Sequence, residues 1–117
     1  METRNMETRN AVSALSSLAQ ESRLAVFRLL VQAGEEGLAA GEISRLTGIP
    51  PSSLSFHLKE LTLGQMVASR QEGRFVIYKA QFDTMNALLA FLTQNCCGGQ
   101  PCLPLPTCQP DALKELS

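Results

Sequence analysis

The amino-acid sequence predicts a mainly α-helical (α+β) domain, and three observations lead to that class. Apolar residues recur at helical spacing in five segments between residues 6 and 95. Two short strand-like runs lie on either side of Gly73, a pattern typical of a β-hairpin. The chain has 117 residues, 44% hydrophobic and 18% charged, which suits one globular domain and excludes a disordered or collagen-like chain.

Two helices are expected at the start of the domain, over residues 6–19 and 21–33. In the first, apolar side chains such as Val12 and Leu15 recur on one face. The second ends before Gly34, because glycine readily adopts the backbone conformation that terminates a helix. Both helices are therefore amphipathic, with one side available for a core.

Two further helices are expected over residues 41–47 and from about residue 52 to residue 63. Gly48 ends the first, and Pro50 disfavours a helical conformation at the residue before it. In the second helix the apolar residues recur at i, i+4 and i+7 and are expected to face the core: Leu54, Leu58 and Leu61. A helix, a tight turn and a second helix therefore occupy the middle of the chain.

A hairpin and a final helix complete the expected domain. Strands over residues 66–70 and 75–79 are joined by residues 71–74. Asp83 is expected to cap a last helix that runs to about Asn95, because an aspartate side chain accepts a hydrogen bond from the first helical turn.

The sequence divides into three regions. Residues 1–5 are repeated as residues 6–10, and we interpret them as a duplicated start without a structural role. Residues 6–95 form the expected folded domain, and residues 96–117 form a Cys-, Pro- and Gly-rich tail. Because no secretory signal opens the sequence and no run of about 18 apolar residues occurs, we expect a cytoplasmic protein that spans no membrane.

Five stretches of the domain form a combination that is more specific than any one of them. Gly41–Ile49 is followed by Ser53–Leu61, and Leu63–Val67 is followed by Arg70–Tyr78; Leu18–Phe27 lies upstream. Together they resemble the helix-turn-helix, the wing and the start of the second helix in the ArsR/SmtB family of metalloregulatory repressors. The resemblance implies a winged helix-turn-helix fold, in which a homodimer binds double-stranded operator DNA.

The candidate DNA-binding residues lie on the helix over residues 52–63 and on the hairpin. A recognition helix needs an apolar face that holds it and a polar face that enters the major groove. Arg70 and Lys79 flank the hairpin and would add non-specific attraction to phosphates. The candidates for closer contact are Ser52, Ser53, Ser55, His57, Lys59 and Arg74.

The distribution of charge favours a DNA-binding surface here, although an explanation without DNA binding stays open for each candidate residue. Residues 41–80 carry five Lys and Arg against three Glu, net +2, while the whole chain has a net charge of −1. Ordinary surface scatter is the alternative for this asymmetry. The serines would then lie on a solvated helix face, His57 would be a hydrogen-bonded structural residue, and Arg74 would be a solvated hairpin charge.

The first and last helices have apolar faces that are large for so small a domain. The family resemblance implies that these two helices form the homodimer interface, with Leu15, Leu88 and Leu92 as its candidate residues. The alternative is that both helices complete the core of the monomer.

All four cysteines lie within thirteen residues, at Cys96, Cys97, Cys102 and Cys108. Two disulfides are one interpretation, but nothing signals secretion, so a reduced cluster with metal or redox chemistry is favoured. Thiolates prefer soft ions, and three of them suit the pyramidal geometry of trivalent arsenic. Cys96, Cys97 and Cys102 are therefore the candidate metal ligands, and Cys108 is a further candidate.

The resemblance leaves the tail as the candidate effector site. Some family members use cysteines in the third helix, and others use histidines on the last helix, but this sequence has neither. Arsenite or antimonite is the expected effector. Cadmium, lead or zinc, disulfide-based redox sensing and inert cysteines are the alternatives.

No enzyme is expected, and no catalytic cofactor. The sequence has no glycine-rich phosphate loop, no His-Glu-x-x-His and no Gly-x-Ser-x-Gly. A module that buffers metal or binds another protein, with the winged helix only as a scaffold, is the alternative from a different functional class.

Overall fold

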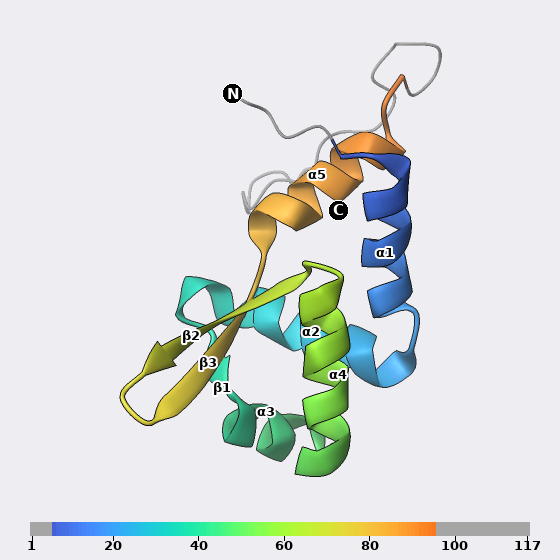
Figure 1. The fold of residues 1–117 in the computed structure, drawn as a ribbon. Helices are drawn as coiled ribbons and strands as arrows, with labels where there is room; N and C mark the ends of the chain where they lie inside the picture. The colour runs from blue at the N-terminus through green and yellow to red at the C-terminus, as the bar shows by residue number, and fades with distance from the viewer. Residues whose placement is uncertain (1–5, 96–117) are drawn as a thin grey trace, which may run out of the picture.

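The computed structural model describes residues 6–95 (Figure 1), and within them it is mainly helical with a small antiparallel sheet. This confirms the expected α+β class. The elements are α1 (Thr8–Leu18), α2 (Glu21–Ala33), the 3-10 turn η1 (Gly34–Glu36), β1 (Leu38–Ala39), α3 (Ala40–Thr47), α4 (Pro51–Leu63), β2 (Val67–Glu72), β3 (Phe75–Ala80) and α5 (Phe82–Leu92). None of the described helices is long and apolar enough to cross a membrane.

Two elements were not expected from the sequence, namely η1 and the two-residue strand β1. The sheet order is β1-β3-β2, with both pairs antiparallel, and Leu38 lies opposite Tyr78. Gly37 makes this pairing possible. It adopts a φ of +69°, and a Cβ atom at this position would lie 2.4 Å from the carbonyl oxygen of Tyr78. A glycine is therefore required where β1 joins the hairpin.

The final helix differs from its expected boundaries at both ends. Its N-cap residue is Gln81, and Asp83 lies in the first turn without capping it. The prediction that Asp83 caps α5 was therefore wrong, although a carboxylate in a first turn still interacts favourably with the helix dipole. The helix ends at Leu92 instead of Asn95.

The core lies between α1, α2, α4 and the inner face of the sheet. Its fully buried large side chains come from α2, α3, α4, β2 and the residue before β2: Val26, Leu30, Ile43, Leu54, Leu61, Met66 and Val67. Helix α1 crosses close to the end of α4 because Gly64 has no side chain there. A Cβ atom on Gly64 would lie 2.5 Å from the side chain of Ser17. This close crossing fixes the orientation of α4 relative to α1.

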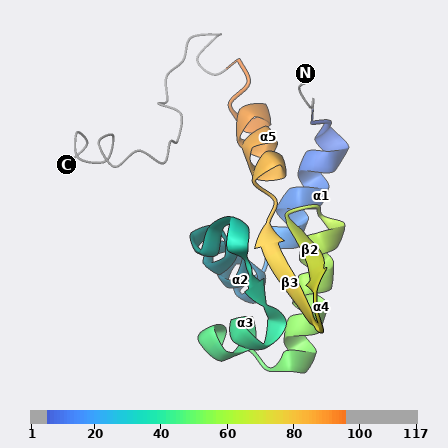
Figure 2. The same cartoon turned by 90° about the vertical axis from the view of Figure 1, so that its left-hand side faces the viewer.

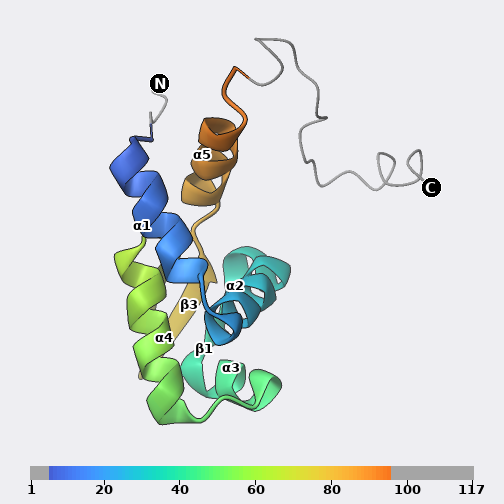
Figure 3. The same cartoon turned by 90° about the vertical axis from the view of Figure 1, so that its right-hand side faces the viewer.

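The elements are segregated along the molecule. Helices α1 and α5 contact each other at one end, and all three ribbon views place them together (Figures 1, 2 and 3). Helix α3, the first turn of α4 and the tip of the β2–β3 hairpin lie at the opposite end (Figure 2). The predicted dimer helices and the predicted DNA-binding elements are thus at different ends.

Candidate nucleic-acid interface

The turn between α3 and α4 is held by a small set of local hydrogen bonds. Gly48 ends α3 with a φ of +78°, a left-handed conformation that glycine adopts without strain. Ser44 Oγ donates to the carbonyl oxygen of Ile49 at 2.6 Å, and the Ile49 N–H donates to Thr47 Oγ1 at 3.2 Å. Pro51 then occupies the first position of α4, where its fixed φ suits a helix start. These bonds set the angle at which α4 leaves α3.

Helix α4 separates a buried side from an exposed side. The buried side chains are Leu54, His57, Leu58 and Leu61. Ser52, Ser53, Ser55 and Lys59 are exposed. The structure therefore places four of the six predicted DNA-binding residues together on the outer side of one helix, where a duplex has access to them.

His57 differs from its expected place, since its side chain is only 8% exposed. Consecutive helical residues are about 100° apart, so His57 falls close to the direction of the three leucines. Its Nδ1 atom is enclosed and has no hydrogen-bond partner among the described residues. His57 is thus a buried residue of the protomer, and the structure corrects its place among the exposed DNA-contact candidates.

Phe56 was missed by the sequence reasoning, although it is 56% exposed on α4. Its ring lies beside Arg23 of α2, whose guanidinium carbon is 6.0 Å from the ring centroid. The same helical geometry that places His57 inward places Phe56 outward. The spacing of the leucines in the sequence therefore already indicates that Phe56 faces outward. Phe56 was missed because only polar residues were considered as DNA contacts.

Arg74 lies at the tip of the hairpin, directly after Gly73. The side chain is exposed, and so are the neighbouring Phe75 and Val76 of β3. Gly73 has a φ of +61°, which a tight hairpin turn requires. The tip thus projects a cation away from the core, where it stays a candidate for contact with a DNA backbone or minor groove.

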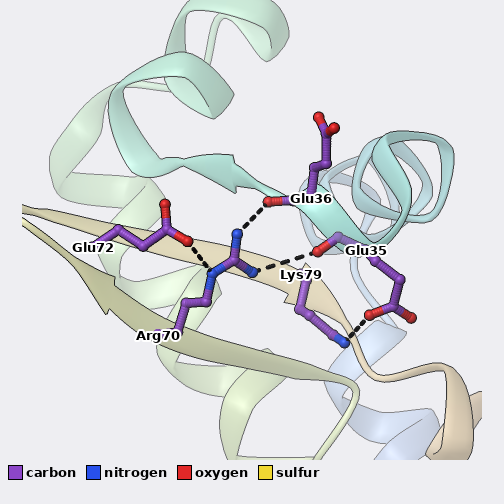
Figure 4. A network of polar contacts seen from close by, with 5 residues as sticks. All are labelled: Glu35, Glu36, Arg70, Glu72 and Lys79. Carbon is purple, nitrogen blue, oxygen red and sulfur yellow. Dashed lines mark hydrogen bonds and ion pairs between the residues drawn. The ribbon is translucent and has the colours of Figure 1, made fainter.

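Arg70 and Lys79 do not project freely, which corrects the expectation that they would attract phosphates. Arg70 donates from Nη2 to the carbonyl oxygen of Glu36 at 2.8 Å, and from Nε to Glu72 at 2.7 Å (Figure 4). Lys79 forms an ion pair with Glu35 (Figure 4). Both cations therefore connect the hairpin to η1.

Helix α3 also carries an internal ion pair. Arg45 donates to the carboxylate of Glu42, one turn before it, and both side chains point to solvent. This hydrogen bond holds the pKa of Glu42 below its ordinary value. Arg45 is thereby engaged within α3.

A cleft of about 270 Å³ lies between α4 and the sheet. Ser55, Lys59, Ser69 and Tyr78 contribute polar groups to its walls. Two of the candidate residues of α4 therefore line one wall of the cleft, and strands β2 and β3 line the other. A protein of this shape can place a helix in one groove of a duplex and a hairpin against the adjacent backbone.

The predicted dimer residues are divided by the structure. Leu15 of α1 and Leu92 of α5 are exposed, the latter by 55%. Leu88 is only 5% exposed and belongs to the core of the protomer, which corrects its place in the interface. Val12 and Leu89 are also exposed on these two helices. We refer to Val12, Leu15, Leu89 and Leu92 as the apolar end surface.

The predicted metal ligands lie outside the described residues, and this holds for Cys96, Cys97, Cys102 and Cys108 alike. Within residues 6–95 no group of three or more His, Cys, Asp or Glu side chains is placed to hold a metal ion.

Known proteins match this arrangement in sequence and in structure. A family model described as a helix-turn-helix domain matches residues 18–70. An uncharacterized HTH-type transcriptional regulator of Bacillus subtilis, YceK, is 33% identical over 73 residues, which cover 62% of this chain and 72% of that protein. The "Putative arsenical resistance operon repressor ArsR" of Halobacterium salinarum is 38% identical over 68 residues, 58% of this chain and 52% of that protein.

A solved structure has the same fold. The homodimeric winged helix-turn-helix domain Mb0332 of Mycobacterium bovis, described as a possible ArsR-family regulator, aligns with a TM-score of 0.59 and 22% identity. The alignment covers 87% of this chain and 100% of that domain. This chain belongs to the HTH-type transcriptional regulators. In this protein, α3 and α4 form the helix-turn-helix, and β2 with β3 forms the wing. Its relatives are regulators, a class without enzymatic activity.

Proposed function

We propose that this chain is a homodimeric repressor of the ArsR family that binds operator DNA through α4 and the wing. We further propose that it releases the DNA when trivalent arsenic binds the C-terminal cysteines. The observation that carries the DNA-binding part is the exposed side of α4, where Ser52, Ser53, Ser55 and Lys59 surround the first turns. A major groove about 12 Å wide accepts a helix of this kind.

The wing supports the same orientation. With the first turns of α4 in the major groove, the hairpin tip lies at the same end of the protein, and Arg74 reaches the backbone or minor groove beside it. Small side chains allow the helix to approach base edges, while Lys59 and Arg74 neutralise phosphates. Position and charge thus agree on one docking surface.

Dimerisation is supported by the apolar end surface, whose four side chains are exposed in the protomer. Large exposed apolar patches are typical of interaction sites. A two-fold dimer through α1 and α5 places two recognition helices in successive major grooves, about 34 Å apart. The Mycobacterium bovis domain of the same fold is homodimeric.

The arsenic part rests on chemistry and on one relative. Three closely spaced thiolates match the preference of trivalent arsenic for soft donors. The Halobacterium relative carries the name of an arsenical resistance operon repressor. Only residues 93–95 separate the end of α5 from Cys96 in the sequence, so we expect an ion bound to Cys96 to act close to the helix that we assign to the dimer.

A challenge assay tests the whole proposal. Duplexes selected by the protein from a random library are bound by the reduced protein and then titrated with arsenite, antimonite, cadmium, lead, zinc or peroxide. Release by arsenite at the lowest concentration is expected. If another ion or peroxide releases the DNA at a lower concentration than arsenite does, that agent is the effector and the arsenic assignment is wrong. If the protein binds no DNA at all, the proposed repressor function is wrong.

The apolar end surface gives a prediction about assembly. Changing Leu92 to glutamate should yield a monomer at micromolar concentration that binds DNA at least about tenfold more weakly, because dimer formation would bury an unpaired charge. Sedimentation velocity measures the change. Leu46→Glu is the matched control, since Leu46 is similarly exposed but lies on α3, and this variant should stay dimeric. A monomeric wild-type protein would remove the basis of the prediction.

The anchoring of the wing gives a second prediction. Arg70→Met removes the hydrogen bonds to η1 and keeps the aliphatic stem, so the wing is less fixed and DNA affinity should fall by about three- to tenfold. Because Arg70 does not contact phosphate, the slope of log affinity against log salt should stay unchanged. Lys59→Met is the control, and it should reduce that slope by about 0.9 for each phosphate that Lys59 neutralises in the wild type. A reduced slope for Arg70→Met would show that Arg70 contacts DNA directly.

A further inference from the structure

Phe56 occupies the centre of the exposed side of α4. With about 100° between consecutive residues, the three buried leucines of α4 define an inward direction, and Phe56 lies within about 20° of the opposite direction. None of the four exposed polar candidates, Ser52, Ser53, Ser55 and Lys59, lies as close to that outward direction. In the first two turns of the recognition helix, the residue closest to the outward direction is therefore an aromatic one.

The ring of Phe56 is exposed, yet it contacts a neighbouring side chain, that of Arg23. Its side chain is 56% exposed, and the Arg23 guanidinium carbon lies 6.0 Å from the ring centroid, within cation–π range. The backbone of Arg23 is held at the start of α2, because its N–H donates to the side chain of Gln20 at 3.1 Å. Its Nε atom is enclosed and has no hydrogen-bond partner among residues 6–95. The guanidinium of Arg23 thus lies over the Phe56 ring, and more than half of the Phe56 side chain stays exposed.

The chemistry of a phenyl ring limits what it reads in a major groove. The ring has no hydrogen-bond donor or acceptor, so it gains nothing from the polar edges of guanine, adenine or cytosine. Thymine alone among the four bases presents an apolar group there, its 5-methyl group, and phenylalanine is one of the side chains that pack against it. A central Phe56 therefore suits one thymine in each half-site.

We propose that Phe56 determines specificity for a thymine in each operator half-site by packing against its 5-methyl group, with Arg23 as a positioning residue. This inference rests on the proposed function, since it requires α4 to lie in the major groove. The serines and Lys59 then surround the apolar contact and position the helix on phosphates and on neighbouring base edges.

The test uses the full-length dimer and synthetic duplexes chosen by selection from a random library. Each thymine of the selected site is replaced in turn by deoxyuridine, which removes only the methyl group and keeps the base pair. At one position in each half-site, this replacement should weaken binding by about three- to fivefold, the loss expected for one buried methyl group. Replacing both symmetry-related thymines should multiply the two losses.

Protein variants connect the methyl group to the ring. Phe56→Ala should bind the thymine and deoxyuridine duplexes equally, and Phe56→Leu should retain part of the preference because leucine is also apolar. Arg23→Met should reduce the preference without removing it. Phe75→Ala is the matched control, because Phe75 is an equally exposed phenylalanine, at 59%, on the wing, and it should keep the full deoxyuridine penalty.

The outcomes separate this inference from the function on which it rests. Wild-type protein that selects a site but tolerates deoxyuridine at every thymine overturns the role of Phe56 and leaves the repressor intact. A deoxyuridine penalty that persists in Phe56→Ala does the same. If no site is selected at all, the DNA-binding function fails, and the inference fails with it.

Discussion

Replacing Ser53 and Ser55 together by glutamate should abolish operator binding and leave the fold intact. Both side chains are exposed on the outer side of α4, so the substitutions disturb no packed contact. In the groove, however, each new carboxylate faces phosphates of like charge and base acceptors with which it cannot form a hydrogen bond, which costs on the order of several kcal/mol. We expect the affinity for a selected duplex to fall by at least about a hundredfold, measured by fluorescence anisotropy.

The control carries the same charge on a different surface. Ala25→Glu combined with Gln32→Glu adds two carboxylates to exposed positions of α2. This variant should retain affinity within a fewfold, because only the long-range field of the protein changes. Equal melting temperatures would show that both proteins are folded. Undiminished binding by the α4 variant would falsify the assignment of α4 as the recognition helix.

The helix-turn-helix could be predicted from sequence because local rules decide it. Gly48 and Pro50 mark the turn, and the three leucines fix which side of α4 is buried. The predicted helix over residues 52–63 differs from α4 by one residue at its start. Here the hydrophobic period, the terminating glycine and the proline all favour the same structure, so the prediction needed no tertiary information.

The wrong predictions concern side chains whose position depends on tertiary contacts and cannot be inferred from the residue type alone. His57 was placed with the polar candidates of α4, but the structure buries its side chain beside the leucines. Arg70 and Lys79 were expected to attract DNA, but their partners Glu35 and Glu36 lie more than thirty positions away in the sequence. No local pattern reveals such a pairing. The strand β1 was missed for the same reason, since two residues give no periodic signal.

The apolar residues of α5 show a further limit of sequence patterns. Leu88 and Leu92 lie four positions apart and were placed together at a dimer interface. The structure buries Leu88 within the protomer and exposes Leu92. A helix that packs on its own domain with one side and on a partner with another has a broad apolar surface. The spacing of its apolar residues does not tell which of them face the core and which face the partner. Only the folded protomer separates them.

Replacing any one of three cysteines by serine should abolish the release of DNA by arsenite. This is the largest effect that we expect on the response to the effector. Cys96→Ser, Cys97→Ser and Cys102→Ser should each bind the selected duplex as the wild type does, yet stay bound when arsenite is added. Each change removes one of three thiolates from a site that needs all of them. Cys97 and Cys102 are separated by only four residues, so closing the loop between them costs little entropy.

Cys108→Ser serves as the control and should respond like the wild type. Arsenic releases the operator only if it binds the DNA-incompetent state more tightly than the competent one. A difference of about 3 kcal/mol lowers DNA affinity by roughly a hundredfold, a typical coupling free energy for an allosteric protein. Arsenite titrations of the bound duplex under reducing conditions measure this release for all four variants. Loss of the response in Cys108→Ser would show that the fourth thiolate is a ligand, and a site of four sulfurs would replace the three-sulfur site.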